Sequence, residues 1–334
     1  MKFIRLIKNF LERIRSCRKT LTYRKTNCLS QGFKFVYVKI FFSINKLFES
    51  IRFLLSREKV LLNVWAICSN SQAKPLNFGD DLNFFIFKIL SNSKPCFNYS
   101  SLLPFLIKDK ENILGIGSII ESHVNKDSII WGSGSMYGDV DLKQKTKKVL
   151  AVRGPLTRKY LCAQGVSCPE VYGDPALLLP FLYKKKNDRP KYKVGVIPHF
   201  KDFDSKYLLN LRNDPNVKLI RVKRYQKLEY VIDEICDCEF IVASSLHGLI
   251  VADAYNIPNL WIKFSDNIEG GFFKYFDYFM SVGRKDREPV VVTNAILKED
   301  LLKYKDMYTP IKYDPRMLIE NSPFGKDILE CFKM

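Results

Sequence analysis

The sequence predicts an α/β fold in two halves, and three features of its pattern indicate this. Phe240–Ile262 (FIVASSLHGLIVADAYNIPNLWI) has the order of a parallel βαβ unit: a buried strand, a polar turn, a helix and a second strand. Short apolar strands that run into polar loops and helices also occur before it. Between these regions, residues 184–193 (KKKNDRPKYK) form a polar, charged and proline-bearing segment, which is typical of an interdomain linker.

Length and composition agree with this class. The 334 residues suffice for two α/β domains, and a hydrophobic content of 47% with 13% aromatics argues against disorder. The nine cysteines are scattered without a CxxC pair. We therefore expect reduced thiols in a cytosolic protein and no metal site.

The positive charge is concentrated at the N-terminus. Residues 1–59 hold 15 Lys and Arg against three Glu, a net charge of +12, so the remaining residues carry +7 of the total of +19. Lys2–Arg15 spaces apolar residues three and four apart with basic residues between them, which predicts an interfacial amphipathic helix. Residues 33–48 are aromatic-rich but too short and too charged to span a bilayer. We expect this arm to bind an anionic membrane surface; the alternative is a helix packed on the body with a solvated basic face.

Neither a signal peptide nor nucleic-acid binding is expected. Charges interrupt any apolar core in the first residues, no small-residue cleavage site follows, and no recognition motif accompanies the basic arm.

The first half opens with a predicted strand at Val60–Ile67. A loop ending in Asn77-Phe78-Gly79-Asp80-Asp81 follows, and then a helix over Leu82–Leu90. Asn77 or Asp80 can cap this helix, and Gly79 lets a ligand approach the backbone. Without other information, these residues are equally well explained as an ordinary cap and turn.

Two Gly/Ser loops follow the next predicted strands. Asn112–Ile116 runs into Gly115-Ile116-Gly117-Ser118, and Ser128–Trp131 runs into Gly132-Ser133-Gly134-Ser135. Such loops suit a sheet edge that admits a substrate closely. Neither loop is a GxGxxG or Walker sequence, so a nucleotide site has no support.

Arg153 follows the predicted strand Lys148–Val152 and precedes Pro155, which suits the first turn of a helix over Leu156–Ala163. A guanidinium at that point can bind a carboxylate or a phosphate through paired hydrogen bonds. The alternative is a surface arginine in a salt bridge. Farther along, Asp174 lies in a tight turn, where its role could be structural.

Two of the three histidines in the sequence follow predicted strands of the second half. His199 follows Val194–Ile197, and His247 follows Ser244 and Ser245 at the start of a helix. Hydroxyls, an imidazole and the free N–H groups of a helix N-terminus together make an anion site. The alternative is that His247 packs beneath the helix.

The rest of the second half alternates predicted strands and helices. We predict a strand at Val217–Val222 and a helix at Leu228–Cys236. Phe272–Gly283 pairs aromatics around Lys274, either to stack on sugar or as core packing. Weak helices are expected at Ala295–Tyr304 and Arg316–Phe332.

Taken in order, these motifs resemble the polysaccharide pyruvyltransferase family, especially its branch acting on bacterial exopolysaccharides. SSLHGLIVADAYNIPNLWI is similar to the C-terminal signature of that family, and the resemblance runs from about residue 77 to 283 through NFGDD, GIGSII, WGSGSM, AVRGPLT, GDPA and IPHFKD. Many members carry an Arg two residues before the signature His, where this chain has Ser245. Which cation replaces that Arg is left open.

The resemblance implies two Rossmann-like domains facing each other across a cleft, as in GT-B glycosyltransferases. With the basic amphipathic helical arm, the expected organisation is 1–58 arm, 59–185 N-terminal domain, 190–285 C-terminal domain and 286–334 helical tail. The implied reaction transfers pyruvate from phosphoenolpyruvate to two hydroxyls of a sugar as a ketal and releases phosphate. Neither a cofactor nor a metal is expected.

The resemblance also implies roles for the motif residues. His247 is the expected acid and Asp80 the expected base. Donor binding is expected from Arg153, Ser244, Ser245, Gly117, Ser118 and His199. The acceptor or the surrounding loops involve Asn77, Gly79, Gly134, Ser135, Asp174 and Lys274.

The acceptor is expected to be a lipid-linked oligosaccharide, which places the enzyme in the cytoplasm, peripheral on the inner face of a bacterial membrane. Two other functions stay open. One is a GT-B glycosyltransferase using a nucleotide sugar, and the other is a non-catalytic, membrane-docked glycan-binding protein.

Overall fold

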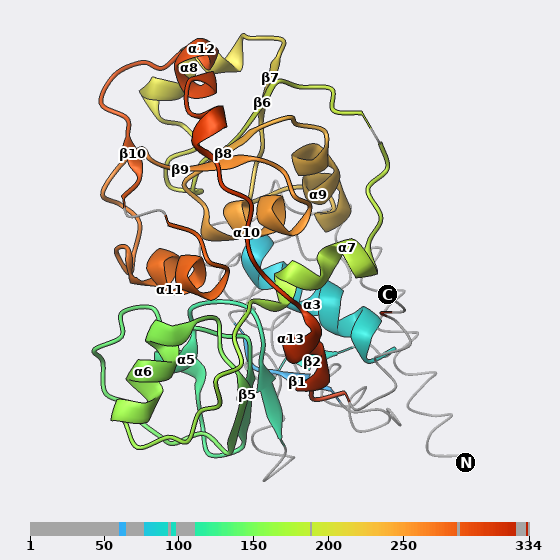
Figure 1. Cartoon of the computed structure of the whole chain (residues 1–334), viewed down its shortest axis with the longest axis vertical. Coiled ribbons are helices and arrows are strands. Elements are labelled where there is room, and N and C mark those ends of the chain that lie inside the picture. Colours follow the sequence, from blue (N-terminus) through green and yellow to red (C-terminus); the bar gives the residue numbers. More distant parts are fainter. Residues whose placement is uncertain are drawn as a thin grey trace, which may run out of the picture. The chain divides into compact units, whose positions relative to one another are not determined.

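The fold is built on two parallel β-sheets that follow one another along the chain (Figure 1). The computed structural model describes residues 60–64, 77–92, 95–97, 111–187, 189–285, 288–324 and 332. The predicted amphipathic arm, 1–58, and the predicted strand beyond Val64 lie outside the described residues. Within them the α/β prediction is confirmed, because both sheets are parallel and are connected through helices.

The first sheet has the order β2-β1-β3-β4-β5. Its strands are β1 (Leu61–Leu62), β2 (Cys96–Phe97), β3 (Asn112–Leu114), β4 (Ser128–Trp131) and β5 (Lys148–Ala151). The helices along this part of the chain are α3 (Phe78–Leu90), α5 (Ile120–His123) and α6 (Pro155–Ala163). All three residues of β3 are buried, as expected for a parallel strand covered on both faces.

The second sheet has the order β10-β9-β8-β6-β7. Its strands are β6 (Val194–Ile197), β7 (Val217–Leu219), β8 (Ile241–Ala243), β9 (Asn259–Lys263) and β10 (Val290–Val291). The helices along it are the 3-10 helix η2 (Lys206–Leu208), α8 (Leu209–Arg212), α9 (Leu228–Cys236), α10 (Leu246–Ala254) and α11 (Phe273–Ser281). Every residue of β6 and β8 is buried.

Both sheets share one connectivity, which positions the site. In each, the first strand in chain order lies between the second and the third, so the direction of winding reverses between β1 and β3 and again between β6 and β8. Ligands of open α/β sheets bind outside the carboxyl ends of the strands at such a reversal. The loops that leave β1, β3, β6 and β8 carry Asn77–Asp80, Gly117–Ser118, His199 and Ser244–His247.

The C-terminal residues pack on both sheets. The 3-10 helix η1 (Pro175–Leu178) and α7 (Leu179–Leu182) lead toward the second half, and α12 (Lys298–Leu302), η3 (Lys305–Met307) and α13 (Arg316–Glu320) follow β10. Leu301 of α12 joins a core cluster with residues of β6 and β8, whereas the Leu318 carbonyl of α13 accepts from Trp131 Nε1 of β4 at 3.0 Å. Both α12 and α13 are shorter than the helices predicted there.

The larger core cluster draws on residues of both halves, including Leu114 of β3 and Ile130 of β4 with Ile197 of β6 and Leu249 of α10. The described residues accordingly all belong to one compact unit. None of the helices in the described part of the chain has the length and apolar run that crossing a bilayer requires.

Candidate functional site

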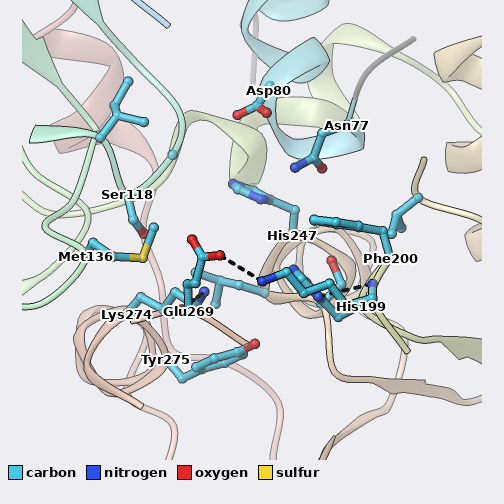
Figure 2. A pocket seen from close by; sticks show the side chains of 16 residues that line it. Asn77, Asp80, Ser118, Met136, His199, Phe200, His247, Glu269, Lys274 and Tyr275 are labelled. Carbon is cyan, nitrogen blue, oxygen red and sulfur yellow. Dashed lines mark hydrogen bonds and ion pairs between the residues drawn. The ribbon is translucent and has the colours of Figure 1, made fainter. Parts of the chain in front are cut away.

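A cavity of about 200 Å³ lies where the loops from the two reversal points meet (Figure 2). It brings together eight of the residues predicted from the sequence: Asn77, Asp80, Gly117, Ser118, His199, Ser245, His247 and Lys274. The other six lie behind the cavity wall. Each contacts a residue that lines the cavity or is next to such a residue in the sequence, as described below. These are Gly79, Gly134, Ser135, Arg153, Asp174 and Ser244.

Asn77 and Asp80 come from the start of α3. The Asn77 side chain caps the helix by accepting from the backbone N–H of Gly79 at 3.3 Å, and Asp80 lies in the first turn, half-buried at the cavity. Burial raises the pKa of Asp80, the interaction with His247 opposes this and the neighbouring Asp81 adds to it, so that the pKa is about 7. A carboxyl that titrates near neutral pH suits proton transfer. Figure 2 shows Asp80 beside His247.

His247 enters from the first turn of α10, whose N-cap residue Ser245 makes no side-chain capping hydrogen bond. The ring packs on the backbone of Gly79, where a Cβ atom would stand 2.1 Å from His247 Nδ1. Gly79 therefore makes room for the imidazole of His247, whereas the sequence led us to expect that it makes room for a ligand. The opposite nitrogen, Nε2, lies 3.7 Å from Asp174 Oδ2.

The two Gly/Ser loops run side by side as extensions of β3 and β4. The N–H of Gly134 donates to the Gly117 carbonyl at 3.0 Å, and Gly117 has a φ of +119°, which favours glycine. Ser118 lines the cavity, whereas the Ser135 hydroxyl donates to Glu121. Of the two loops, the first one supplies the cavity wall, and Gly134 and Ser135 hold it in place.

Arg153 lies beneath this wall and not at the cavity mouth. Its side chain is 1% exposed and donates from Nε to Asp277 at 3.0 Å, from Nη1 to Ser118 Oγ at 2.5 Å and from Nη2 to the Ser135 carbonyl at 2.7 Å. Gly134 leaves room for the guanidinium, because a Cβ atom there would stand 2.2 Å from Arg153 Cζ. Arg153 therefore forms the salt bridge of the alternative, with Asp277 on α11, but it is buried and not at the surface as that alternative had it.

His199 and Ser244 form the floor between β6 and β8. The His199 N–H donates to Ser244 Oγ at 2.8 Å, so Ser244 positions the histidine loop while Ser245 faces the cavity. Burial, followed by the nearby positive charges of Lys274 and Lys201, lowers the pKa of His199 to about 4. His199 is therefore a neutral imidazole at pH 7 and contributes hydrogen bonds instead of charge.

Two lysines supply the positive charge of the cavity. Lys274 was predicted, but Lys201 and the acidic Glu269 were missed; Lys201 follows His199 in the same loop, which is the signal that could have found it. Glu269 accepts from Lys201 Nζ at 2.7 Å through its carboxylate and from Lys274 Nζ at 2.8 Å through its carbonyl (Figure 2). Burial, followed by repulsion from Arg153, lowers the pKa of Lys274 to about 8.

No group of three or more His, Cys, Asp or Glu side chains is arranged to hold a metal ion within the described ranges. Burial raises the pKa of Cys168, Cys236 and Cys238 to about 12, so these thiols stay protonated. The expectation of a reaction without metal or cofactor stays a prediction.

Comparison with known proteins gives three findings. The family model described as polysaccharide pyruvyl transferase matches residues 77–266, which includes most of the cavity. The chain is 30% identical over 238 residues to the uncharacterized protein L143 of Acanthamoeba polyphaga mimivirus, covering 68% of this chain and 78% of that protein. It is 28% identical over 222 residues to the succinoglycan biosynthesis protein ExoV of Rhizobium meliloti, covering 64% of this chain and 65% of ExoV.

Among solved structures, the chain resembles an uncharacterized protein from Klebsiella pneumoniae. The match has a TM-score of 0.40 and 13% sequence identity, and it covers 79% of this chain and 99% of that one.

Proposed function

Because the chain belongs to the polysaccharide pyruvyl transferase family, we propose that it transfers pyruvate from phosphoenolpyruvate to a sugar of an exopolysaccharide repeat unit. The product is a cyclic ketal, and phosphate is released. The observation that carries this proposal is one cavity that combines a histidine, a carboxyl with a pKa near neutrality and two lysines. These are the groups that an anionic enol donor and a hydroxyl acceptor require.

The donor binds at the lysine side of the cavity in this proposal. Its carboxylate and phosphate pair with Lys201 and Lys274, and the N–H groups at the start of α10 add a partial positive charge. These lysines replace the cation that other family members supply at the position of Ser245. Arg153 does not touch the donor; it supports Ser118 from behind.

The proton transfers fall to His247 and Asp80. His247 gives its proton to the methylene carbon of the donor, and the first sugar hydroxyl adds to the adjacent oxocarbenium-like carbon while Asp80 takes the hydroxyl proton. The second hydroxyl then attacks the same carbon as phosphate leaves with that hydroxyl's proton. Asp80 and His247 are close enough to interact electrostatically, so Asp80 can return its proton to the ring.

The test supplies the full chain with phosphoenolpyruvate and a defined oligosaccharide. The proposal expects release of inorganic phosphate together with a mass gain of one pyruvate ketal on the sugar. If nucleotide is released from a sugar nucleotide instead, the chain is a glycosyltransferase. If neither occurs and calorimetry detects no heat with phosphoenolpyruvate, it is a binding protein.

The cellular setting belongs to the same proposal. A lipid-linked acceptor would lie at a membrane surface, and the N-terminal charge of +12 over residues 1–59 supports attachment to anionic lipid. We therefore propose a cytoplasmic enzyme, peripheral on the inner face of the membrane.

A further inference from the structure

Asp174 occupies the turn that follows the first sheet. It is the N-cap of η1, where its Oδ1 accepts from the backbone N–H of Ala176 at 2.9 Å. Only one carboxylate oxygen is used in this way. The side chain is 1% exposed, so the second oxygen has no access to bulk water.

The second oxygen faces the ring of His247. Asp174 Oδ2 and His247 Nε2 are both buried, neither makes a hydrogen bond in the described structure, and they are 3.7 Å apart. Buried polar atoms nearly always have partners, and a buried carboxylate without one is costly. Two such atoms directed at each other indicate a pair that closes into a charge-assisted hydrogen bond when the ring is protonated.

We propose that Asp174 is the positioning residue of His247: it accepts from Nε2–H, fixes the orientation of the ring and leaves Nδ1 for proton exchange with the substrate. This inference rests on the proposed function, in which His247 is the acid. The choice of nitrogen follows from access, because Nε2 is buried whereas the ring as a whole lines the cavity. Gly79 has no Cβ, which lets the imidazole pack in this orientation against the Gly79 backbone.

Three contacts keep Asp174 away from water. Tyr313 covers Gly173, where a Cβ atom would stand 2.0 Å from the Tyr313 hydroxyl, and Pro175 packs against Gly132. The Tyr313 hydroxyl also donates to the Tyr172 carbonyl at 3.2 Å. In such a dry site, the attraction between carboxylate and imidazolium is stronger than at a surface.

The pair also joins the two halves. Asp174 follows the first sheet, and His247 begins α10 of the second, so the arrangement exists only when η1 and α10 are in contact. The other titratable groups around it are Asp80 on α3, His199 and Lys201 after β6, Glu269 and Lys274 on the opposite cavity wall, and Tyr278 and Tyr313 near Asp174.

The decisive experiment is Asp174→Asn in the full chain, followed by nitrogen NMR of the histidine rings through a pH titration. The sequence contains only three histidines, so His123 and His199 serve as internal references. We expect the Nε2 resonance of His247 to shift away from that of a hydrogen-bonded N–H, because the hydrogen bond made by a ring nitrogen decides which nitrogen is protonated. The reference histidines should not move, and Asp174→Glu should restore part of the shift.

Asn retains an oxygen for the Ala176 N–H, so the cap and the melting temperature should be kept. If Asp174→Asn does not fold, Asp174→Ser offers a second capping residue without charge. In the pyruvyl-transfer assay, we expect kcat to fall roughly 100-fold, with the KM for phosphoenolpyruvate nearly unchanged.

The outcomes separate the inference from the proposed function. An unchanged Nε2 resonance of His247 in both uncharged variants overturns the inference, even if kcat falls. Wild-type protein without pyruvyl transfer overturns the proposed function, while the titration still reports whether the pair exists.

Discussion

Among single side chains, Asp80 is the one whose ionisation acts on both stability and turnover. Its pKa is raised from 3.8 to about 7, so the folded state holds this proton more tightly than the unfolded state does. Between about pH 4 and pH 7 the folded state therefore binds more protons, and the Asp80 contribution to stability falls as pH rises. Above pH 7 the full cost of keeping this carboxylate in the fold is present.

Asp80→Asn should therefore stabilise the protein at pH 8 while removing activity. A shift of three pKa units is worth about 4 kcal/mol at most, and partial exposure at the cavity lowers the expected gain to about 1–3 kcal/mol. Turnover should fall roughly 100- to 10,000-fold, because the base is lost. Urea unfolding at pH 4 and pH 8, together with the phosphate-release assay, measures both effects.

The matched control is Asp81→Asn, one residue along the same helix. Asp81 accepts a hydrogen bond from the Tyr225 hydroxyl; Asn keeps an acceptor oxygen but loses the charge, so the weaker bond should destabilise the fold slightly and leave turnover largely intact. If the two variants change stability and turnover by the same amounts, Asp80 is not the base of the reaction.

Glu269 is a carboxylate of the protein that lines the part of the cavity where we propose that the donor binds. Glu269→Gln should lower the KM for phosphoenolpyruvate, because Lys201 no longer pairs with a carboxylate of the protein. The carboxylate is 71% exposed, and such pairs are worth about 0–1 kcal/mol, so the expected change is at most about five-fold. Asp266→Asn, which breaks the Lys263 pair of the same loop, is the control and should leave KM unchanged. A raised KM would show that Glu269 helps to hold the lysines in place.

Sequence reasoning located the site residues that follow strands closely. Ser118 and His247 were found in this way, because parallel strands deliver their following loops to one edge. Asp80 was found from the NFGDD sequence at the start of α3. The burial of Arg153 could not be predicted, since its partner Asp277 lies 124 residues further along the chain. Glu269 gave no local signal either; it precedes Gly270 and Gly271, whose positive φ values turn the loop back toward the cavity.

The secondary-structure elements also divide into those that the sequence predicts and those that it does not. β4, β6 and α9 have the predicted bounds, because each is a full apolar strand or a helix with clear periodicity. The edge strands β2 and β10 were not predicted, since two residues show no periodicity and pair only because a neighbouring strand is present.

The contact between α6 and α11 depends on the buried Arg153–Asp277 pair. Asp277 also accepts from the Thr157 N–H at 2.8 Å and from its hydroxyl at 2.6 Å, which ties α11 to the start of α6. Asp277→Asn should lower the free energy of unfolding by about 3–5 kcal/mol, because it leaves a buried guanidinium uncompensated. Adding Arg153→Met should recover part of this loss in a double-mutant cycle measured by urea unfolding.

An exposed ion pair on the same helix provides the comparison. Arg158 pairs with Glu170 at 3.1 Å, with the carboxylate 72% exposed, so Glu170→Gln should cost less than about 1 kcal/mol. If Asp277→Asn leaves stability unchanged and raises only the KM for phosphoenolpyruvate, the pair serves the ligand more than the helix contact.

Considered as a whole, the molecule assembles its site from two sheets of equal connectivity, with each reversal point supplying one wall of the cavity. The parallel sheets were predictable from the order of strands and helices. The equal strand order was not, because it depends on which strands pair across long stretches of sequence. The way in which residues 288–324 divide between the two sheets also had no sequence signal.

The N-terminal arm is predicted to attach the enzyme to membranes independently of its chemistry. Deleting residues 1–55 should abolish binding to anionic vesicles, because a charge excess of +12 lies before residue 60 and each basic residue near the lipid contributes roughly 1 kcal/mol. Turnover on a soluble acceptor analogue should persist, since the described residues that line the cavity lie at position 77 or beyond. Vesicle co-sedimentation and the phosphate-release assay test the two halves of this prediction.

The dependence of vesicle binding on salt and on lipid charge distinguishes electrostatic attachment of the arm from apolar attachment. If attraction between charges dominates, binding of the full chain should weaken steeply above 0.1 M salt, where the Debye length is about 10 Å, and should be absent on neutral lipid. Binding that ignores salt would assign attachment to the apolar residues of the arm, Phe3, Ile7, Phe10 and Ile14. If the truncated chain neither folds nor turns over the soluble acceptor, the arm belongs to the core and its basic residues are a solvated surface.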